Sequence, residues 1–301
     1  MKIAYFGTPE FAVPILETLI SKDNIEIVAV ITQPDKKFGR KQETISPAVK
    51  ISAQKFNLPV FQPENSQELN KITKNLKVDF FVVVAFGMIF NQETLNIPKY
   101  GCINIHPSLL PKYRGASPLH EAILHGDQET GVSIMEMSAK MDAGPLYICQ
   151  RLKINESDDI NTLTIKTSLL ASQLLPETLS DIMEGYLTSV PQSKTNISYC
   201  KKIKKEDGEI HKNKSAKEII NMYRAYKEWP EIYTIQNDKK IKLLEIEISD
   251  YQDQAGTLVK HGKELFLGTK TKSIKINKIQ PEGKNPMDAQ SFINGNQALF
   301  K

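Results

Sequence analysis

The first half of the chain alternates short apolar runs with amphipathic stretches. Apolar, β-branched runs predict buried strands, and apolar residues spaced three or four positions apart predict helices. Phe80 to Phe86 is apolar throughout, which is typical of a central parallel strand covered on both faces. Because strands alternate with helices, the pattern predicts an α/β fold with a doubly wound parallel sheet. The predicted strands are 2–6, 25–32, 58–61, 78–85 and 101–106, with helices at 11–19, from Ser46-Pro47 and at 66–76.

The pattern changes near residue 189. A predicted helix at 117–126, a strand at 130–137 and a long helix over 158–186 complete the first domain. Ser189 to Asn196 is polar and reads as a linker. A helix at 215–227 and short strands between turns then favour a small β-barrel of the oligonucleotide-binding type. We therefore expect a first domain over 1–188, a linker over 189–206 and a C-terminal barrel domain over 207–301.

Composition excludes several classes of protein. A chain of 301 residues with 40% hydrophobic and 25% charged residues is long enough for two ordinary globular domains. Its apolar runs are too short to cross a membrane, and Met1 leads directly into a strand rather than into a signal peptide. Cys102, Cys149 and Cys200 are too scattered for a disulfide framework or a metal site. Such cysteines fit a reducing environment, so a cytoplasmic location is expected. We expect a monomer, because no exposed apolar stripe stands out.

Charge is distributed unevenly. Residues 201–301 carry a net charge of +6, whereas residues 1–200 carry −2. Such a basic half suggests contact with a polyanion. The polar segment 33–44 is also basic at its centre, so we expect an exposed loop that meets a charged partner. Solvated surface lysines would give the same pattern.

Candidate chemistry is concentrated in Gly101 to Gly115, where a predicted strand runs into a loop rich in Pro and Gly. Asn104 and His106 are two residues apart, so they share one face at the carboxyl end of the strand. An amide donor beside an imidazole suits a developing oxyanion. Two polar residues that only cap a strand end would look the same. Asp142 lies in the turn Lys140 to Pro145, which would expose a carboxylate.

Other chemistries lack their signatures. The turn after the first strand, Gly7-Thr8-Pro9, has one glycine where a dinucleotide-binding fold needs three, and no Walker loop occurs. His120 and His125 have no partners at metal-ligand spacing, so we expect surface or packing roles and no metal.

The order of these residues resembles the folate-dependent formyltransferases. Asn104-x-His106, Ser108-Leu-Leu-Pro111 and the distant Asp142 match motifs of that superfamily, and the match runs nearly from end to end. The basic loop and the C-terminal domain are similar to the branch that acts on initiator methionyl-tRNA. Further matching segments are Phe6 to Glu10, Thr32 to Asp35, Ser46 to Lys50, Val83 to Gly87, Asp127 to Val132, Lys284 to Met287 and Phe292 to Gly295.

The resemblance implies a Rossmann-like catalytic domain, an oligonucleotide-binding-like barrel and 10-formyltetrahydrofolate as formyl donor. By the same resemblance, Asn104 and a cationic His106 stabilise the oxyanion, and Asp142 pairs with His106 and helps to relay a proton. The pterin would lie against a set of mostly apolar residues. That set comprises Phe86, Gly87, Met88, Ile89, Ser108, Leu109, Leu110 and Pro111.

The tRNA contacts implied by the resemblance are in the basic loop. Arg40 would engage the acceptor end, and Lys36, Lys37 and Lys41 would attract phosphate. His211 and Lys37-Phe38 depart from residues common in the family, so contacts there are less defined. Another formyltransferase acting on a nucleotide-linked amine or purine precursor, a formyltetrahydrofolate hydrolase, and an RNA-binding protein with a decayed enzyme domain stay open as alternatives.

Overall fold

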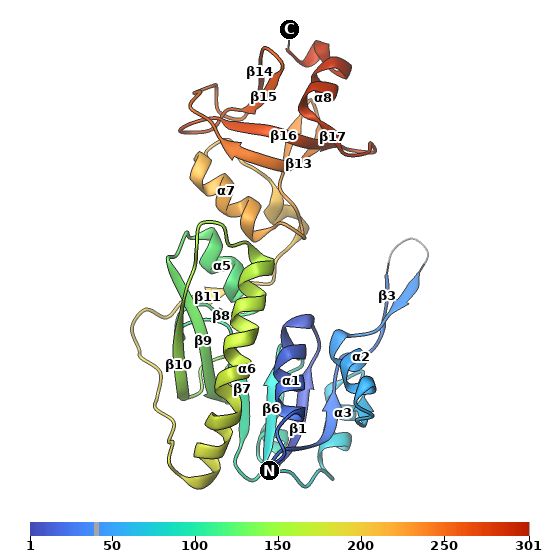
Figure 1. Ribbon diagram of the computed structural model, residues 1–301, viewed down its shortest axis with the longest axis vertical. Coiled ribbons are helices and arrows are strands. Elements are labelled where there is room, and N and C mark those ends of the chain that lie inside the picture. Colours follow the sequence, from blue (N-terminus) through green and yellow to red (C-terminus); the bar gives the residue numbers. More distant parts are fainter. Residues whose placement is uncertain (39–41, 301) are drawn as a thin grey trace. The chain divides into compact units, whose positions relative to one another are not determined.

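The computed structural model describes residues 1–38 and 42–300. Two compact units make up the chain (Figure 1). Unit 1 comprises Met1–Pro118, Glu129–Ile154 and Asn161–Cys200, and unit 2 comprises Leu119–Gln128, Asn155–Ile160 and Lys201–Lys301.

Unit 1 is built on a seven-stranded sheet in the described part of the chain, with strand order β5-β2-β1-β6-β7-β9-β10. The first five strands in this order run parallel, which confirms the predicted α/β class. β9 runs antiparallel to both of its neighbours, a reversal that the sequence did not predict. The strands are β1 (Lys2–Gly7), β2 (Glu26–Ile31), β5 (Val60–Phe61), β6 (Phe80–Val84), β7 (Cys102–His106), β9 (Glu129–Glu136) and β10 (Leu146–Lys153).

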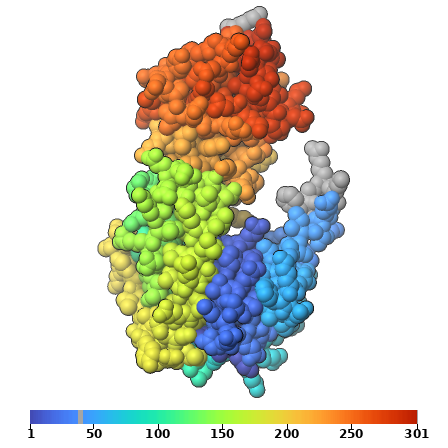
Figure 2. All heavy atoms as spheres, viewed as in Figure 1, coloured from blue at the N-terminus to red at the C-terminus, as the bar shows by residue number. Residues whose placement is uncertain are grey.

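Helices cover both faces of this sheet. On one face, α1, α2 and α6 pack against Ile103 and Ile105 of β7 and their neighbours on other strands. On the other face, α3 and α4 pack against residues that include Cys102 and Phe81. Figure 2 shows the surface of α1 in blue beside that of α6 in yellow-green. The helical segments of unit 1 are η1 (Glu10–Ala12), α1 (Val13–Ile20), α2 (Ala48–Lys55), α3 (Ser66–Thr73), α4 (Gln92–Leu95) and α6 (Ile160–Glu184).

Unit 2 contains a second, antiparallel sheet with the order β12-β13-β16-β15-β14, in which β17 also pairs with β16. Its core includes Leu243, Leu265, Phe266, Ile276 and Phe292, each at most 1% exposed. Its strands are β12 (Tyr233–Gln236), β13 (Lys239–Ile248), β14 (Leu258–His261), β15 (Glu264–Leu267), β16 (Ile274–Pro281) and β17 (Met287–Asp288). Its helical segments are α5 (Pro118–Leu124), η2 (Lys205–Gly208), α7 (Ala216–Ala225), α8 (Ala289–Gly295) and η3 (Gln297–Phe300).

Helix α7 explains why two segments that precede residue 161 belong to unit 2. The Nδ2 atom of Asn221 donates to the carbonyl of Leu124 at 3.4 Å. The guanidinium of Arg224 donates to the carbonyls of Asp158 at 2.6 Å and Asn155 at 2.9 Å. These hydrogen bonds attach residues 119–128 and 155–160 to the helix.

The basic segment 33–44 contains two short strands rather than an unbroken loop. β3 (Lys36–Phe38) pairs antiparallel with β4 (Glu43–Ile45). The side chains of Lys36 and Lys37 are exposed, whereas Arg40 and Lys41 lie outside the described residues. Among the helices that the structure describes, none combines the length and apolar character needed to span a lipid bilayer.

Candidate active site

Asn104 and His106 lie where the sequence analysis expected them, on one face of β7 at its carboxyl end. Ile103 and Ile105 point into the core on the opposite face, because successive residues of a strand alternate between faces. Opposite His106 on β9 lies Ser133, and opposite Asn104 lies Met135. The Asn104 side chain is half-buried and has no hydrogen-bond partner among the described residues, so its amide is available to a ligand.

The imidazole of His106 is held by one backbone carbonyl. Its Nε2 atom lies 2.9 Å from the carbonyl oxygen of Tyr113, and a carbonyl oxygen can only accept, so Nε2 carries the proton. Nδ1 is therefore the ring nitrogen that can gain or lose a proton. That nitrogen faces the Asp142 carboxylate, with Oδ2 at 3.7 Å.

Burial controls the charge of His106. The side chain is only 6% exposed, and loss of solvation lowers the pKa of His106, an effect that exceeds the opposing influence of the Asp142 charge and of the Tyr113 carbonyl. Since the ordinary histidine pKa is about 6.5, the imidazole is neutral at neutral pH in the unliganded protein. A cationic His106 forms there only when Nδ1 receives a proton during a reaction.

Asp142 is fixed by its backbone as well as by its carboxylate. Its φ of 49° lies in the left-handed region, which residues with a β-carbon seldom adopt. Oδ2 accepts a hydrogen bond from the backbone N–H of Gly115 at 2.8 Å. Gly115 itself has φ 122°, and a Cβ there would lie 2.2 Å from the carbonyl oxygen of Cys200. Only glycine fits at this position, where β8 (Arg114–Gly115) pairs with β11 (Tyr199–Cys200).

The loop after β7 is anchored by two serines. The hydroxyl of Ser108 donates to the carbonyl of Lys112 at 2.6 Å, inside the loop. The hydroxyl of Ser133 donates to the carbonyl of Ser108 at 2.7 Å and accepts from the backbone N–H of Leu110 at 3.1 Å. Sequence reasoning did not identify Ser133, because a serine in a strand of mixed polar and apolar residues carries no local signal of its contacts.

The residues expected around the pterin differ in accessibility. The ring of Phe86 is buried and packs against Phe6 and Phe90, with centroids 5.5 and 6.2 Å away. Gly87 and Ile89 are exposed, and Met88 is half-buried. Ser108 and Leu110 are buried, while Leu109 and Pro111 are half-buried. Any contact from Phe86 or Ser108 to a ligand would therefore come from the backbone.

Loops at the carboxyl ends of three strands meet at this edge of the sheet. The carbonyl of Phe86, after β6, accepts from Thr8 Oγ1 after β1 at 3.3 Å and from Gln33 Nε2 after β2 at 3.1 Å. In open α/β sheets, ligands bind at this edge, where the strand order reverses. The backbone N–H groups of Gly87, Met88 and Ile89 have no partner in the described part of the chain, which leaves them free to bind a ligand's acceptor atoms.

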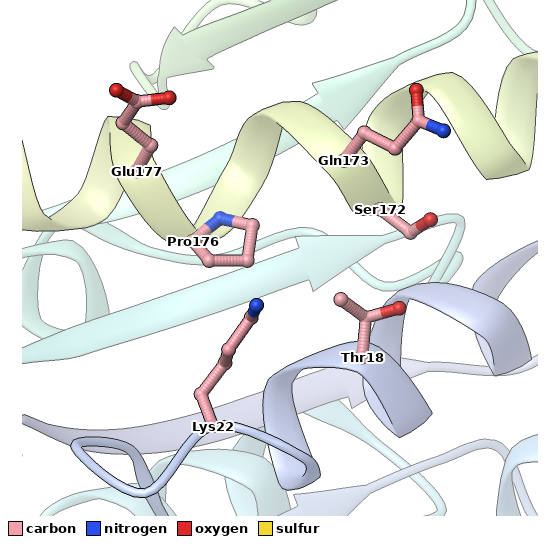
Figure 3. A pocket seen from close by; sticks show the side chains of 6 residues that line it. All are labelled: Thr18, Lys22, Ser172, Gln173, Pro176 and Glu177. Atoms are coloured by element: carbon pink, nitrogen blue, oxygen red, sulfur yellow. The ribbon is translucent and has the colours of Figure 1, made fainter.

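A surface groove lies apart from these strand ends. A groove of about 410 Å³ runs between α1 and α6 (Figure 3), but it contains none of the residues described above. In the described residues, no group of three or more His, Cys, Asp or Glu side chains is arranged to hold a metal ion. The groove is lined by Thr18, Lys22, Ser172, Gln173, Pro176 and Glu177.

Comparison with known families identifies the class. A family model described as formyl transferase matches residues 1–179, and one described as formyl transferase, C-terminal domain, matches residues 202–297. The crystal structure of WlaRD, a sugar 3N-formyl transferase in the presence of dTDP and 5-N-formyl-THF, has the same fold. It shows a TM-score of 0.67 at 21% identity and covers 95% of this chain and 99% of its own. The two family models and the fold therefore place the chain among the formyltransferases, a class of enzymes.

Curated relatives identify the family within this class. The methionyl-tRNA formyltransferase of Thermodesulfovibrio yellowstonii is 41% identical over 295 residues, covering 97% of this chain and 95% of its own length. That of Staphylococcus aureus is 39% identical over 306 residues, covering 99% and 97%. The chain belongs to the methionyl-tRNA formyltransferase family.

Proposed function

We propose that this protein transfers the formyl group of 10-formyltetrahydrofolate to the α-amino group of methionyl-initiator tRNA, giving N-formylmethionyl-tRNA for translation initiation. The names of the curated relatives support this reaction. The observation that carries the proposal is the position of Nδ1 of His106, which faces the Asp142 carboxylate at 3.7 Å while Nε2 is held by Tyr113.

This arrangement supplies a proton acceptor for the attacking amine. In the proposed reaction, a new bond joins the α-nitrogen to the formyl carbon, and the bond from that carbon to the folate nitrogen breaks. Neutral Nδ1 of His106 takes the proton that the amine loses, and the cation formed is stabilised by Asp142. The same proton then passes to the leaving folate nitrogen. Protons and charge balance without a covalent enzyme intermediate.

Asn104 would serve the carbonyl oxygen. Its amide projects from the same face of β7 as His106 and lacks a partner among the described residues. A fixed N–H donor stabilises negative charge on oxygen more in the transition state than in the ground state. We assign Asn104, His106 and Asp142 as the catalytic residues.

The residues at the sheet edge fit the folate donor. Ile89 is 75% exposed, and Gly87 has φ 84° with only Gln33 Nε2, at 3.8 Å, near its missing Cβ. The flat, amphipathic pterin ring binds best between apolar walls that also offer a few free backbone N–H donors. We propose that Met88, Ile89, Leu109 and Pro111 supply the walls, and that Phe86, Gly87, Ser108 and Leu110 contribute through their backbone. When bound, 10-formyltetrahydrofolate provides the formyl carbon and the leaving nitrogen.

The tRNA would be held mainly by charge. Lys36 and Lys37 are exposed in the β3–β4 segment, and we retain Arg40 and Lys41 of the same segment as predicted contacts. The excess of Lys over acidic residues beyond residue 200 suits the phosphate backbone, which positions the tRNA without reading sequence. We propose residues 1–188 as the catalytic domain, 207–301 as the tRNA-binding domain and 189–206 as the linker.

The proposal is tested by incubating the protein with 10-formyltetrahydrofolate and charged initiator tRNA, with elongator methionyl-tRNA and a reaction without tRNA in parallel. We expect N-formylmethionine on the initiator tRNA and negligible free formate without tRNA. Rapid formate release without tRNA would identify a hydrolase instead. Formylation of a nucleotide-linked amine but not of methionyl-tRNA would assign the protein to another branch of the superfamily.

A further inference from the structure

Gln192 connects the loop that carries Asp142 to Arg114, the residue before Gly115. It lies in the segment between α6 and β11 that sequence analysis treated as linker. Its Nε2 atom donates to the carbonyls of Asp142 at 2.9 Å and Gly144 at 2.8 Å. Its Oε1 atom accepts from Nε of Arg114 at 3.2 Å and from Nη2 of Arg114 at 2.7 Å. Both amide hydrogens and the amide oxygen are therefore in use.

The partners of Gln192 allow only one amide orientation. The two loop carbonyls need donors, and the guanidinium of Arg114 needs an acceptor. Arg114 is a buried cation, 8% exposed, and a charged donor strengthens the hydrogen bonds that the same amide makes on its other side. Glutamate would keep the acceptor and lose both donors, and leucine would lose all of these bonds at similar size.

The hydrogen bonds of Gln192 hold a strained part of the backbone in place. Asp142 has φ 49°, a conformation that costs a residue with a β-carbon roughly 1–2 kcal/mol. The neighbouring Gly144 is pressed against β9, because a Cβ there would lie 1.8 Å from the carbonyl oxygen of Glu136. The loop is thus held from one side by β9 and from the other by Gln192.

The hydrogen bonds among Gln192, Asp142 and the segment Arg114–Gly115 form a closed ring. Gln192 holds the carbonyl of Asp142 and the side chain of Arg114. The next residue after Arg114 is Gly115, whose backbone N–H binds the carboxylate of Asp142 at 2.8 Å. A single side chain therefore fixes both the residue that carries the carboxylate and the segment that orients it.

We propose that Gln192 is a positioning residue, which keeps the carboxylate of Asp142 beside Nδ1 of His106 by holding the backbone of its loop. This role rests on the proposed function of Asp142 and His106 in formyl transfer. Without Gln192, the Asp142 backbone relaxes from the left-handed region and the carboxylate moves away from the imidazole. Because the Asp142 charge raises the pKa of His106 against the effect of burial, the pKa of His106 falls further in that state.

The test compares Gln192→Leu and Gln192→Glu with the wild type and with Gln173→Leu. Gln173 is an exposed residue of α6 in the groove of Figure 3, so its variant controls for the loss of a glutamine amide in unit 1. For each protein, kcat and the KM for tRNA are measured well below its unfolding temperature. The pKa of His106 is measured by ¹⁵N NMR of histidine-labelled, unliganded protein, with the signal assigned from His106→Asn.

We expect kcat to fall on the order of 10- to 100-fold in both Gln192 variants, the size of effect that a misplaced catalytic group produces, with little change in KM. The pKa of His106 should be lower than in the wild type in both, while Gln173→Leu behaves as the wild type. Wild-type kcat in Gln192→Glu would overturn the role of the two donors. A loss of kcat with an unchanged titration of His106 would overturn the proposal, because the loss would not act through the carboxylate.

The NMR arm needs neither folate nor tRNA. If the wild type made no N-formylmethionyl-tRNA, the proposed function would fail, yet the titration of His106 would still report whether Gln192 positions Asp142. If the wild type formylates tRNA and both Gln192 variants match it in kcat and in titration, the positioning role alone is wrong.

Discussion

The carboxylate of Asp142 faces the imidazole of His106, with Oδ2 3.7 Å from Nδ1. The two residues come from different parts of unit 1, a loop after β9 and the end of β7. The side chain of Asp142 is 15% exposed, and burial lowers the pKa of His106, so that its imidazole is neutral before reaction. This pairing favours a proton moving onto Nδ1 at the moment the amine attacks, which is the basis of the predictions below.

Replacing Asp142 by Asn removes the charge and keeps an oxygen that can accept from Gly115. We expect kcat to fall by about 100-fold or more, because the His106 cation loses its stabilising partner. The pKa of His106 should also fall, since the Asp142 charge opposes the effect of burial. Steady-state kinetics and ¹⁵N NMR measure the two effects. An Asp142→Asn enzyme with wild-type kcat would show that the charge plays no part in catalysis.

Gly144→Ala tests whether close packing of the Asp142 loop on β9 matters for activity. A Cβ at this position would meet the Glu136 carbonyl at 1.8 Å, and a backbone oxygen in a paired strand cannot move aside cheaply. We expect a lower unfolding temperature and a fall in kcat of about tenfold or more, because the loop must shift. Gly295→Ala is the control, since a Cβ there meets nothing within 4 Å. Equal behaviour of the two variants would contradict this account of the loop.

The double variant Lys36→Ala, Lys37→Ala tests the basic segment. Both lysines are exposed, and each phosphate contact contributes a slope of roughly one to the dependence of log affinity on log salt. We expect a several-fold higher KM for tRNA, unchanged kcat and a smaller salt slope. Lys71→Ala, an exposed lysine of α3, is the matched control. If the salt slope stays the same, these lysines make no phosphate contact.

The burial of His120 predicts that the folded protein loses stability in acid. Burial lowers the pKa of His120 to about 4, whereas the unfolded chain binds that proton near pH 6.5. The unfolded state therefore binds more protons between these values, and the free energy of unfolding falls as pH drops from about 6.5 to 4, by up to about 3 kcal/mol for this group. His106 acts in the same direction.

Denaturant unfolding of the wild type and His120→Gln at several pH values checks this expectation. The variant should lose less stability than the wild type below about pH 6.5. Above that pH, the difference between the two proteins should be constant, which supplies the control. Parallel curves down to pH 4 would show that His120 is protonated alike in both states.

The elements that sequence predicted well are those whose own residues carry the signal. The uniform run Phe80–Val84 and the alternation over Cys102–His106 mark a buried strand and its two faces, so the α/β class and the common face of Asn104 and His106 could be predicted. Strand β10 was missed because none of its residues is buried and its exposure does not alternate along the strand. The short strands β3 and β4 sit in a polar segment that reads as a loop.

The supporting contacts of the site could not be predicted for a different reason. Gln192 lies in a stretch whose composition is that of a linker, and its partners are 48 to 78 residues away in sequence. Ser133 is one polar residue within a buried strand. Their roles depend on tertiary neighbours that no local pattern encodes. For His106, the resemblance implied a cation that pairs with Asp142, whereas the burial that lowers the pKa of this residue is seen only in the folded structure.

Single-turnover formylation of methionyl-initiator tRNA by the wild type and His106→Asn tests the central claim most directly. With enzyme in excess and 10-formyltetrahydrofolate saturating, the wild type should convert the tRNA rapidly to N-formylmethionyl-tRNA. His106→Asn should be slower by about 100-fold or more, while its Kd for tRNA stays within about twofold. Formylation by His106→Asn at the wild-type rate would contradict the assignment of Nδ1 as the proton acceptor.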